Sequence, residues 1–479
     1  MLESAQSAES SGSRPHKMPS LLSHIATNLE REFPGKQEFE VSCIRSQPRR
    51  SHALFPHATT SKHCKVYQEE VLCTLFVDEC VPLCAIEASI YTVPSTSTSI
   101  LYISKVDTTG LQSKSTTPSS PTSRTPNPTR NLVQSFIEFH LLHPPHDTKR
   151  IRIHVFAKSQ PQYLFPGSID NSPTKRVLDD KQLLRWWKQT LSLATDSTRT
   201  KSQLFYLVPG MTYLESLPYL PNPTPSPWTY GHPYTTLTSP VHPVSTSPRT
   251  VPLSDHIPAF PDDPKSRFLH ALTCSSLNPS GTEGDYDDVY LQLHELTFVA
   301  GNQSNRQHRL VEIDKELVRE QTRLNEGVEG GIEEWWERMG FRQECCSGVL
   351  VGFFVIGYDS IDESPTSPSP VPATSTTSPI PYPNALPHAV FTKLWTQFHN
   401  QDYSQPHLEP LKLAIEKWFQ DVDRLVQLEI DNETVERGES KRHVTVDNHV
   451  DEDKKRERES TEKVVVNTLA PRKKKKKVE

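Results

Sequence analysis

The stretch PQYLFPGSIDNSPTKRVLDDKQLLRWW, Pro161–Trp187, decides how the middle of this chain is built. It ends inside a helix predicted over Asp179–Leu193, because aspartate is a preferred N-cap and helical spacing follows it. On either side, Arg150–Ala157 (RIRIHVFA) and Gln203–Val208 are typical of strands. In the first of these strands the branched apolar residues fall on one face and basic residues on the other. The stretch therefore predicts a helix between two strands.

Further elements are expected on both sides of this centre. Towards the N-terminus, branched and aromatic residues in alternation predict strands, and one segment near helical spacing predicts a helix. Towards the C-terminus a proline-started helix, a short helix, a buried strand and a long amphipathic helix follow. The expected strands are Val71–Val77, Leu83–Val93, Ser99–Lys105 and Gly348–Ile356, and the expected helices are Asn131–Leu142, Pro264–Leu272, Gly331–Met339 and His407–Ile430. The strands and helices do not alternate in a strict βαβ order. The sequence therefore predicts an α/β protein of mixed α+β type, with a central mixed β-sheet flanked by helices.

The composition predicts that part of the chain does not pack. Of 479 residues, 42 are proline and only 34% are hydrophobic, so we expect roughly 300 ordered residues in one core. Three Ser/Thr/Pro-rich segments, residues 112–128, 221–252 and 364–383, are interpreted as long disordered loops that interrupt one domain of residues 36–430. Linkers between separate domains are the weaker alternative, because the pieces between them are too short to hold cores of their own.

Both ends of the chain are predicted to be flexible. Residues 1–35 are expected to be a flexible N-terminal segment, and residues 431–479 a disordered, charged tail. The tail closes with six consecutive basic residues, Arg472–Lys477. We interpret this run as a nuclear localisation signal, the alternative being a solvated tail. The expected location is therefore the nucleus.

Several classes of protein are disfavoured by the same inspection. Eight cysteines occur without a CxxC pair, so we expect no metal site. The start lacks the apolar run of a signal peptide, and no 18 consecutive apolar residues occur, so no membrane association is expected. The net charge of −6 and the lack of a zinc, homeodomain or basic-zipper signature argue against sequence-specific DNA binding.

Three local strings go beyond general pattern: Pro161–Trp187, Phe260–His270 (FPDDPKSRFLH) and Leu101–Gly110 (LYISKVDTTG). In order and content they resemble the fungal regulator-of-transposition histone acetyltransferases, a family related in fold to the metazoan CBP-type acetyltransferases. The resemblance implies a CBP-like acetyltransferase fold and transfer of acetyl from acetyl-CoA to a lysine of histone H3. It also implies histone H3–H4 and histone chaperones as partners in chromatin assembly, DNA replication and the damage response. The insertion Gly281–Gly330 has no counterpart in the family.

The Asp262–Asp263 pair is the best candidate for proton transfer. An attacking lysine must lose a proton, because its free pKa is about 10.4 and an ammonium has no lone pair. The resemblance assigns Asp263 this role and makes Asp262 a buried supporting neighbour. The alternative is that Asp-Asp-Pro only caps the helix after it, and a base is dispensable if desolvation alone neutralises the lysine.

Lys265, two residues further on, matches a lysine that members of the family acetylate on themselves. Beside two carboxylates it can form an ion pair, which acetylation would remove. The alternative is an exposed lysine in the first turn of a helix.

The resemblance also implies which residues line the acetyl-CoA and lysine channel and which contact the cofactor. Trp187 and Tyr163 are the predicted catalytic residues of the acetyl-CoA and lysine channel, although both can equally be core aromatics. The predicted cofactor contacts are Val106, Asp107, Thr108, Arg130, Phe156, Gln160, Arg176, Val177, Leu178 and Trp186. The charged members of this set can instead be solvated surface groups.

Taken together, the residues predict that Tyr163, Trp187 and Asp263 converge on one pocket. The competing hypothesis is a catalytically inactive chromatin scaffold or transcription co-regulator with the same fold. Retention of Asp263 and its neighbours argues for the enzyme.

Overall fold

A computed structural model describes the folded parts of the 479-residue chain. The described residues are 20–33, 38–51, 54–55, 65–78, 80–111, 127–144, 148–171, 174–198, 202–221, 226–233, 257–274, 331–342, 345, 348–359, 379, 381–382, 384–404, 408–432 and 444–445.

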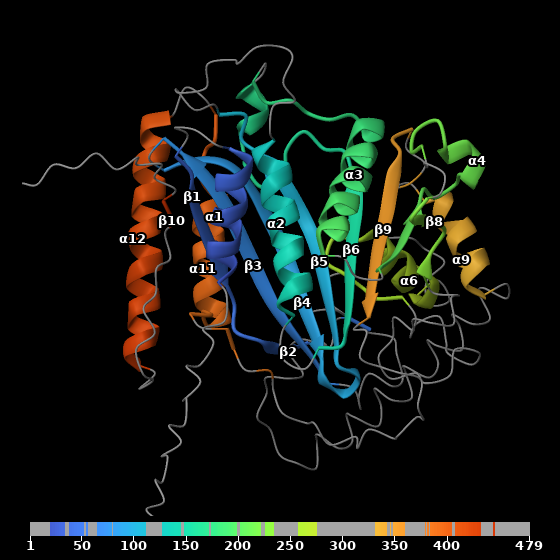
Figure 1. Ribbon diagram of the computed structural model, residues 1–479, viewed down its shortest axis with the longest axis horizontal. Coiled ribbons are helices and arrows are strands. Elements are labelled where there is room, and N and C mark those ends of the chain that lie inside the picture. The colour runs from blue at the N-terminus through green and yellow to red at the C-terminus, as the bar shows by residue number, and fades with distance from the viewer. Residues whose placement is uncertain are drawn as a thin grey trace, which may run out of the picture.

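One mixed β-sheet organises the described part of the chain (Figure 1). Its strand order is β10-β1-β3-β4-β5-β6-β9-β7-β8, and β2 pairs with β3. Neighbouring strands are antiparallel except for the β5–β6 and β7–β8 pairs, which are parallel. The strands are β1 (Glu40–Arg45), β2 (Arg49–Ser51), β3 (Val66–Val77), β4 (Val81–Val93), β5 (Thr98–Thr108), β6 (Arg150–Lys158), β7 (Ser202–Leu207), β8 (Trp228–Tyr230), β9 (Val351–Asp359) and β10 (Val444–Thr445). The predicted central mixed sheet is confirmed.

Three helices, α1 (Leu21–Glu32), α2 (Pro128–Leu142) and α3 (Asp180–Thr198), cover one face of this sheet (Figure 1). In α2 the sequence explains the start of the helix: the Asn127 side chain accepts a hydrogen bond from the Arg130 N–H, and proline stands at the first helical position. Ile153 of β6 belongs to the main hydrophobic core, which these helices share with the sheet.

The other face carries the elements that build the candidate site. There α6 (Pro264–Cys274) and α9 (Gly331–Gly340) pack on β6 and β9 through a second cluster that includes Phe268, Trp335 and Phe353. Because side chains alternate along a strand, consecutive residues of β9 point to opposite faces of the sheet. A Cβ on Gly352 would meet Leu184 of α3, whereas Phe353 contacts Trp336 of α9. The sheet is therefore a wall between α3 and α6.

Two further helices complete the fold near the β1 end of the sheet. These are α11 (His388–His399) and α12 (Leu408–Asn432), which pack together and against β4 (Figure 1). The Phe419 ring lies 4.9 Å from that of Phe76 in β3. The short helix α4 (Tyr213–Ser216) and the 3-10 turns Pro94–Thr96 and Ser168–Asn171 lie in connections.

Every strand and helix expected from the sequence has a counterpart, but three expectations about irregular segments were wrong. The segment 1–35, expected to be flexible, contains α1, whose Leu21, Leu22, Ile25 and Leu29 are buried. The segment 221–252 contributes β8, because Trp228–Tyr230 is free of proline and occupies an edge of the sheet. The tail 431–479 supplies β10, which pairs with β1 at the opposite edge. The helix α11 was not anticipated.

Other expectations fall on residues outside the described part. These are most of the Ser/Thr/Pro-rich segments 112–128 and 364–383, the insertion Gly281–Gly330 and the basic run Arg472–Lys477.

Acid should weaken this fold through His140, which lies fully buried in α2 beside Arg45. Burial, reinforced by Arg45, lowers the pKa of His140 to about 3. The folded state thus binds fewer protons than the unfolded state, where the pKa is about 6.5, and stability falls as the pH drops below 6.5. Between pH 6.5 and 5 this one group should cost about 2 kcal/mol. This loss of stability is measured by urea unfolding of the natural chain and of His140→Gln at the two pH values. Equal pH dependence in both proteins would contradict the assignment.

Candidate active site

A turn before α6 positions the most unusual side chains of the molecule. Asp262 has φ +58, in the left-handed region that aspartate tolerates better than most residues. Asp263 follows as the N-cap of α6, with one carboxylate oxygen 2.9 Å from the Lys265 backbone N–H. Its other oxygen pairs with the Lys265 ammonium. Asp263 therefore caps the helix, as one of the two sequence interpretations expected, and also holds a charge partner.

The Asp263–Lys265 pair is buried. Asp263 is 1% exposed and Lys265 3% exposed. The Lys265 ammonium lies 4.4 Å from the centre of the Phe353 ring and 5.7 Å from that of Phe260. Burial lowers the pKa of Lys265 below the ordinary lysine value, and the Asp263 carboxylate opposes that shift. The expectation of an exposed lysine in the first helical turn is wrong.

Asp262 differs from its neighbour. Its carboxylate is 75% exposed and contacts the Lys105 ammonium at 3.8 Å. The left-handed turn directs the two consecutive side chains to different surroundings. The expectation that Asp262 is a buried neighbour is therefore wrong.

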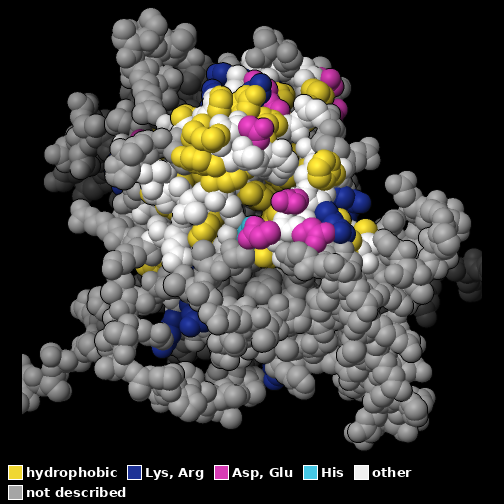
Figure 2. Space-filling view, turned by 90° about the vertical axis from the view of Figure 1, so that its right-hand side faces the viewer, with side chains coloured by type: hydrophobic (Ala, Val, Ile, Leu, Met, Phe, Trp, Pro, Cys, Tyr) yellow, Lys and Arg dark blue, Asp and Glu magenta, His cyan; other side chains and the backbone are white. Residues whose placement is uncertain are grey.

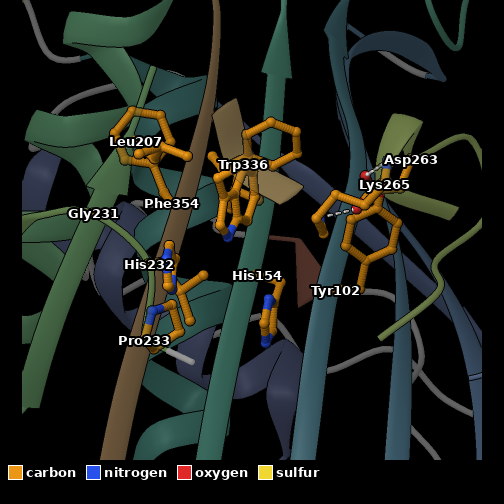
Figure 3. Close-up of a pocket in the computed structure, with 13 residues that line it drawn as sticks. Tyr102, His154, Leu207, Gly231, His232, Pro233, Asp263, Lys265, Trp336 and Phe354 are labelled. Carbon is orange, nitrogen blue, oxygen red and sulfur yellow. Dashed lines mark hydrogen bonds and ion pairs between the residues drawn. The ribbon is translucent and has the colours of Figure 1, made fainter. Parts of the chain in front are cut away.

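A small cavity of about 10 Å³ adjoins the Asp263–Lys265 pair, on the sheet face that α6 and α9 cover (Figure 3). That volume holds about one water molecule. Polar and aromatic side chains from four elements line it. They are Tyr102 of β5, His154 of β6, His232 after β8 and Trp336 of α9.

The lining residues are themselves fixed by contacts. The Tyr102 hydroxyl donates to the Pro261 carbonyl at 3.2 Å, and its ring stacks on Phe260 at 4.3 Å. Burial, reinforced by Asp263, raises the pKa of Tyr102 well above its usual range. The His232 ring stacks on Trp336 at 5.6 Å, and its Nε2 lies 3.3 Å from a Glu333 carboxylate oxygen.

Of the four predicted catalytic residues, the cavity contains only Asp263. Trp187 is 5% exposed and belongs to the main core, on the face of the sheet that α3 covers. Tyr163 is half-buried in the connection after β6 and packs against that same core. The expected convergence on a single pocket is therefore not found in the described residues, because the sheet separates Trp187 from Asp263.

The loop that follows β6 is held by one buried carboxylate. Asp107, predicted to contact the cofactor, accepts hydrogen bonds from the Tyr163 and Leu164 N–H groups at 2.7 and 2.9 Å. It also pairs with the buried Lys175 at 3.0 Å, and Lys175 donates to the Ser168 hydroxyl. The Asp107 side chain thus fixes the shape of the loop.

The other predicted cofactor residues lie near the ends of β5 and β6, in the first turn of α2, and just before or within the first turns of α3. Gln160, Arg176 and Val177 are exposed, whereas the rest are half-buried: Val106, Thr108, Arg130, Phe156, Leu178 and Trp186. The Phe156 ring lies 5.0 Å from that of Phe353, on the face that holds the Asp263–Lys265 pair. The Trp186 ring meets that of Trp187 edge to face at 5.0 Å.

Sequence reasoning missed most of the cavity wall. His154 carried a usable signal, because a histidine opposite the apolar face of an internal strand must be buried against something. Tyr102 lay inside a recognised string and Trp336 inside the helix expected over Gly331–Met339, but neither was singled out. His232 stands in a Ser/Thr/Pro-rich segment that had been assigned to a loop, so no local pattern pointed to it.

Comparison with known proteins identifies the domain. A model of the histone acetyltransferase KAT11-type domain matches residues 25–144 and 120–421. The chain belongs to this family.

Similar proteins agree with the KAT11-type assignment. The chain is 29% identical over 249 residues to the histone acetyltransferase rtt109 of Aspergillus flavus, covering 47% of this chain and 36% of that protein. It is 27% identical over 223 residues to the histone acetyltransferase rtt109 of Schizosaccharomyces pombe, a match that covers 43% of this chain and 41% of that protein. The matches thus span about two fifths of these relatives. The crystal structure of Rtt109 from Aspergillus fumigatus has the same fold, with a TM-score of 0.59 and 22% identity over 84% of this chain and 96% of that one.

Among the described residues, no group of three or more His, Cys, Asp or Glu side chains is arranged to hold a metal ion. The helices described here include none with the length and apolar character of a membrane span.

Replacing Asp107 should release the loop after β6. Asp107→Asn leaves the buried Lys175 ammonium without its counter-charge, and breaking a buried pair costs about 3–5 kcal/mol of unfolding free energy. Amide hydrogen exchange at Tyr163 and Leu164 should also become faster. The matched control is Asp423→Asn on the exposed side of α12, which should stay within about 0.5 kcal/mol. Equal losses in the two variants would contradict a fixing role for Asp107.

Proposed function

We propose that this chain is a histone lysine acetyltransferase that moves an acetyl group from acetyl-CoA to a lysine of histone H3. The observation that carries the proposal is the buried Asp263–Lys265 pair beside the cavity. Membership of the KAT11-type family supports the reaction class. The names of the fungal relatives support histone as the substrate.

Asp263 is the group best placed to receive the proton of the incoming lysine. The substrate amine must be neutral to attack the thioester carbonyl carbon. As the new C–N bond forms and the C–S bond breaks, the amine proton passes to a base and CoA leaves as the thiolate, which then takes up that proton to give the thiol. A 1% exposed carboxylate that adjoins a cavity suits that role, because it is held inside the protein at the edge of the space next to Lys265.

Lys265 provides a means of tuning that carboxylate. While its ammonium is paired with Asp263, one carboxylate oxygen is occupied by that ion pair. Acetylation of Lys265 removes the positive charge and leaves an amide N–H, which still donates a hydrogen bond. The Asp263 carboxylate is then released from the ion pair and available to the substrate amine. Acetylation of the enzyme on Lys265 is thus proposed as an activating modification.

The surface around the start of α3 suits acetyl-CoA in part. Arg176 is exposed and able to meet a phosphate, and the adjacent Val177 is a 44% exposed apolar side chain. Lys175 is excluded as a phosphate ligand, because it is buried in its pair with Asp107. The first N–H groups of α3 are also engaged, since Asp179 caps the Gln182 N–H at 2.7 Å. Arg176 is therefore the residue most able to hold a phosphate in this region.

The surface above the cavity has the charge expected for a histone-binding face. Figure 2 shows acidic side chains gathered beside apolar and basic ones on the side of the molecule formed by α4 and α9. Glu333 and Glu337 of α9 are exposed, and Glu333 contacts the cavity residue His232. The apolar neighbours include Leu214 and Phe341. Lysine- and arginine-rich histone tails are complementary to this acidic rim.

Histone H3–H4, histone chaperones and a nuclear location complete the proposal. The family description and the names of the fungal relatives support a histone as partner. H3–H4, the chaperones and the nuclear location rest on the resemblance of the three sequence strings. A role in chromatin assembly, DNA replication and the damage response rests on the same resemblance.

Asp263→Asn should lower the rate of H3 acetylation by about 100-fold or more, the lower end of what a general base contributes. The assay mixes the full chain, radiolabelled acetyl-CoA and H3–H4, with and without a histone chaperone. Asp423→Asn is the matched control and should keep the natural rate. Cys345→Ala, which changes a buried thiol near Lys265, should also keep it if transfer is direct.

The competing scaffold hypothesis makes the opposite prediction. A natural chain that binds acetyl-CoA but places no label on H3 under any condition would establish the scaffold and end the enzyme proposal. Loss of label in Cys345→Ala but not in Asp263→Asn would replace direct transfer by a route through cysteine.

A further inference from the structure

His154 is a buried polar side chain with an unmet hydrogen bond. It projects from the middle of β6, is 2% exposed, and lines the same cavity as Lys265 (Figure 3). Its Nε2 is buried and has no hydrogen-bond partner among the described residues. Such an orphaned group in a protein interior needs an explanation, because burial without a partner is costly.

The imidazole is uncharged in this setting. Burial, together with the Lys265 and Arg152 cations, holds the pKa of His154 well below its usual range. A neutral imidazole has one N–H donor and one lone pair. His154 is thus suited to a neutral hydrogen-bonding partner, whereas an anion would favour the imidazolium.

His154 and Lys265 both line the cavity and both pack near the ring of Phe260. The His154 ring centre and the Lys265 ammonium lie 5.1 and 5.7 Å from the centre of the same Phe260 ring. Other polar groups on the cavity wall are engaged. Tyr102 donates to the Pro261 carbonyl, and His232 lies against Glu333.

Acetylation of Lys265 would create an acceptor that needs a donor. The modified side chain keeps one N–H, which can still bind Asp263, and gains a carbonyl oxygen inside the protein. That oxygen has to find a donor, because a buried carbonyl without one is destabilising. The unmodified lysine has no such group, which accounts for the orphaned Nε2 of His154 beside it.

We propose that the Nε2–H group of His154 donates a hydrogen bond to the acetyl carbonyl oxygen of acetylated Lys265. His154 is then a positioning residue that holds the modified side chain beside Asp263. The inference rests on the proposed acetylation of Lys265.

The test installs the modification directly. The full chain is produced with Nε-acetyl-lysine, carrying ¹³C at the acetyl carbonyl, incorporated at position 265 during translation. Carbon NMR then reports on the hydrogen bond to that carbonyl, and thermal unfolding reports on its effect. The variants are His154→Gln, which keeps an N–H donor, and His154→Phe, which keeps a ring without one. Each is compared with its own unacetylated form.

The carbonyl resonance should lie downfield of free acetyl-lysine in the natural chain and in His154→Gln, and return towards the free value in His154→Phe. The change in melting temperature on acetylation should be about 2 °C more favourable in the natural and Gln chains than in the Phe chain. A resonance at the free value in the natural chain overturns the inference whether or not the variants fold. An identical effect of acetylation on the melting temperature of all three proteins also overturns the inference.

The outcome is independent of catalysis, because translation supplies the acetyl group. A chain that never labels H3 can still show the hydrogen bond. A fully active chain without it loses only this inference.

Discussion

The ion pair between Asp263 and Lys265 is the interaction on which the rest of the site depends. Two charges removed from water lose more hydration energy than their attraction returns unless the geometry is good and further hydrogen bonds help. Here the Lys265 backbone N–H binds the same carboxylate, and aromatic rings flank the ammonium. A pair of this kind adds little to stability, so its presence beside a cavity points to chemistry. Removing the positive charge by acetylation is the simplest way to set the carboxylate free.

The sheet determines what can reach that pair. Alternation along β6 and β9 sends one set of side chains to α2 and α3 and the other set to α6 and α9. His154 and Phe353 therefore face the Asp263–Lys265 pair, and Trp187 lies behind the wall in the main core. The predicted catalytic role of Trp187 would require it to act from the opposite face of the sheet. The loop fixed by Asp107 follows the end of β6.

Much of the fold was predictable because periodicity is local. Strands such as Arg150–Lys158 can be predicted from alternation, and helices such as Pro264–Cys274 from their caps and prolines. The candidate site was less predictable. Asp263 and Lys265 followed from a resemblance, but the exposure of Asp262 depends on a left-handed φ that sequence spacing does not encode. His232 enters the cavity through contacts with α9, more than a hundred residues away in sequence.

A double-mutant cycle on the buried pair tests the central claim most directly. Unfolding free energies are measured in urea for the natural chain, Asp263→Asn, Lys265→Met and the double variant. Each single change should cost about 3–5 kcal/mol, because it leaves one buried charge without its partner, whereas the double change should cost much less than their sum. Single costs below about 1 kcal/mol that simply add would match an exposed pair and contradict the account.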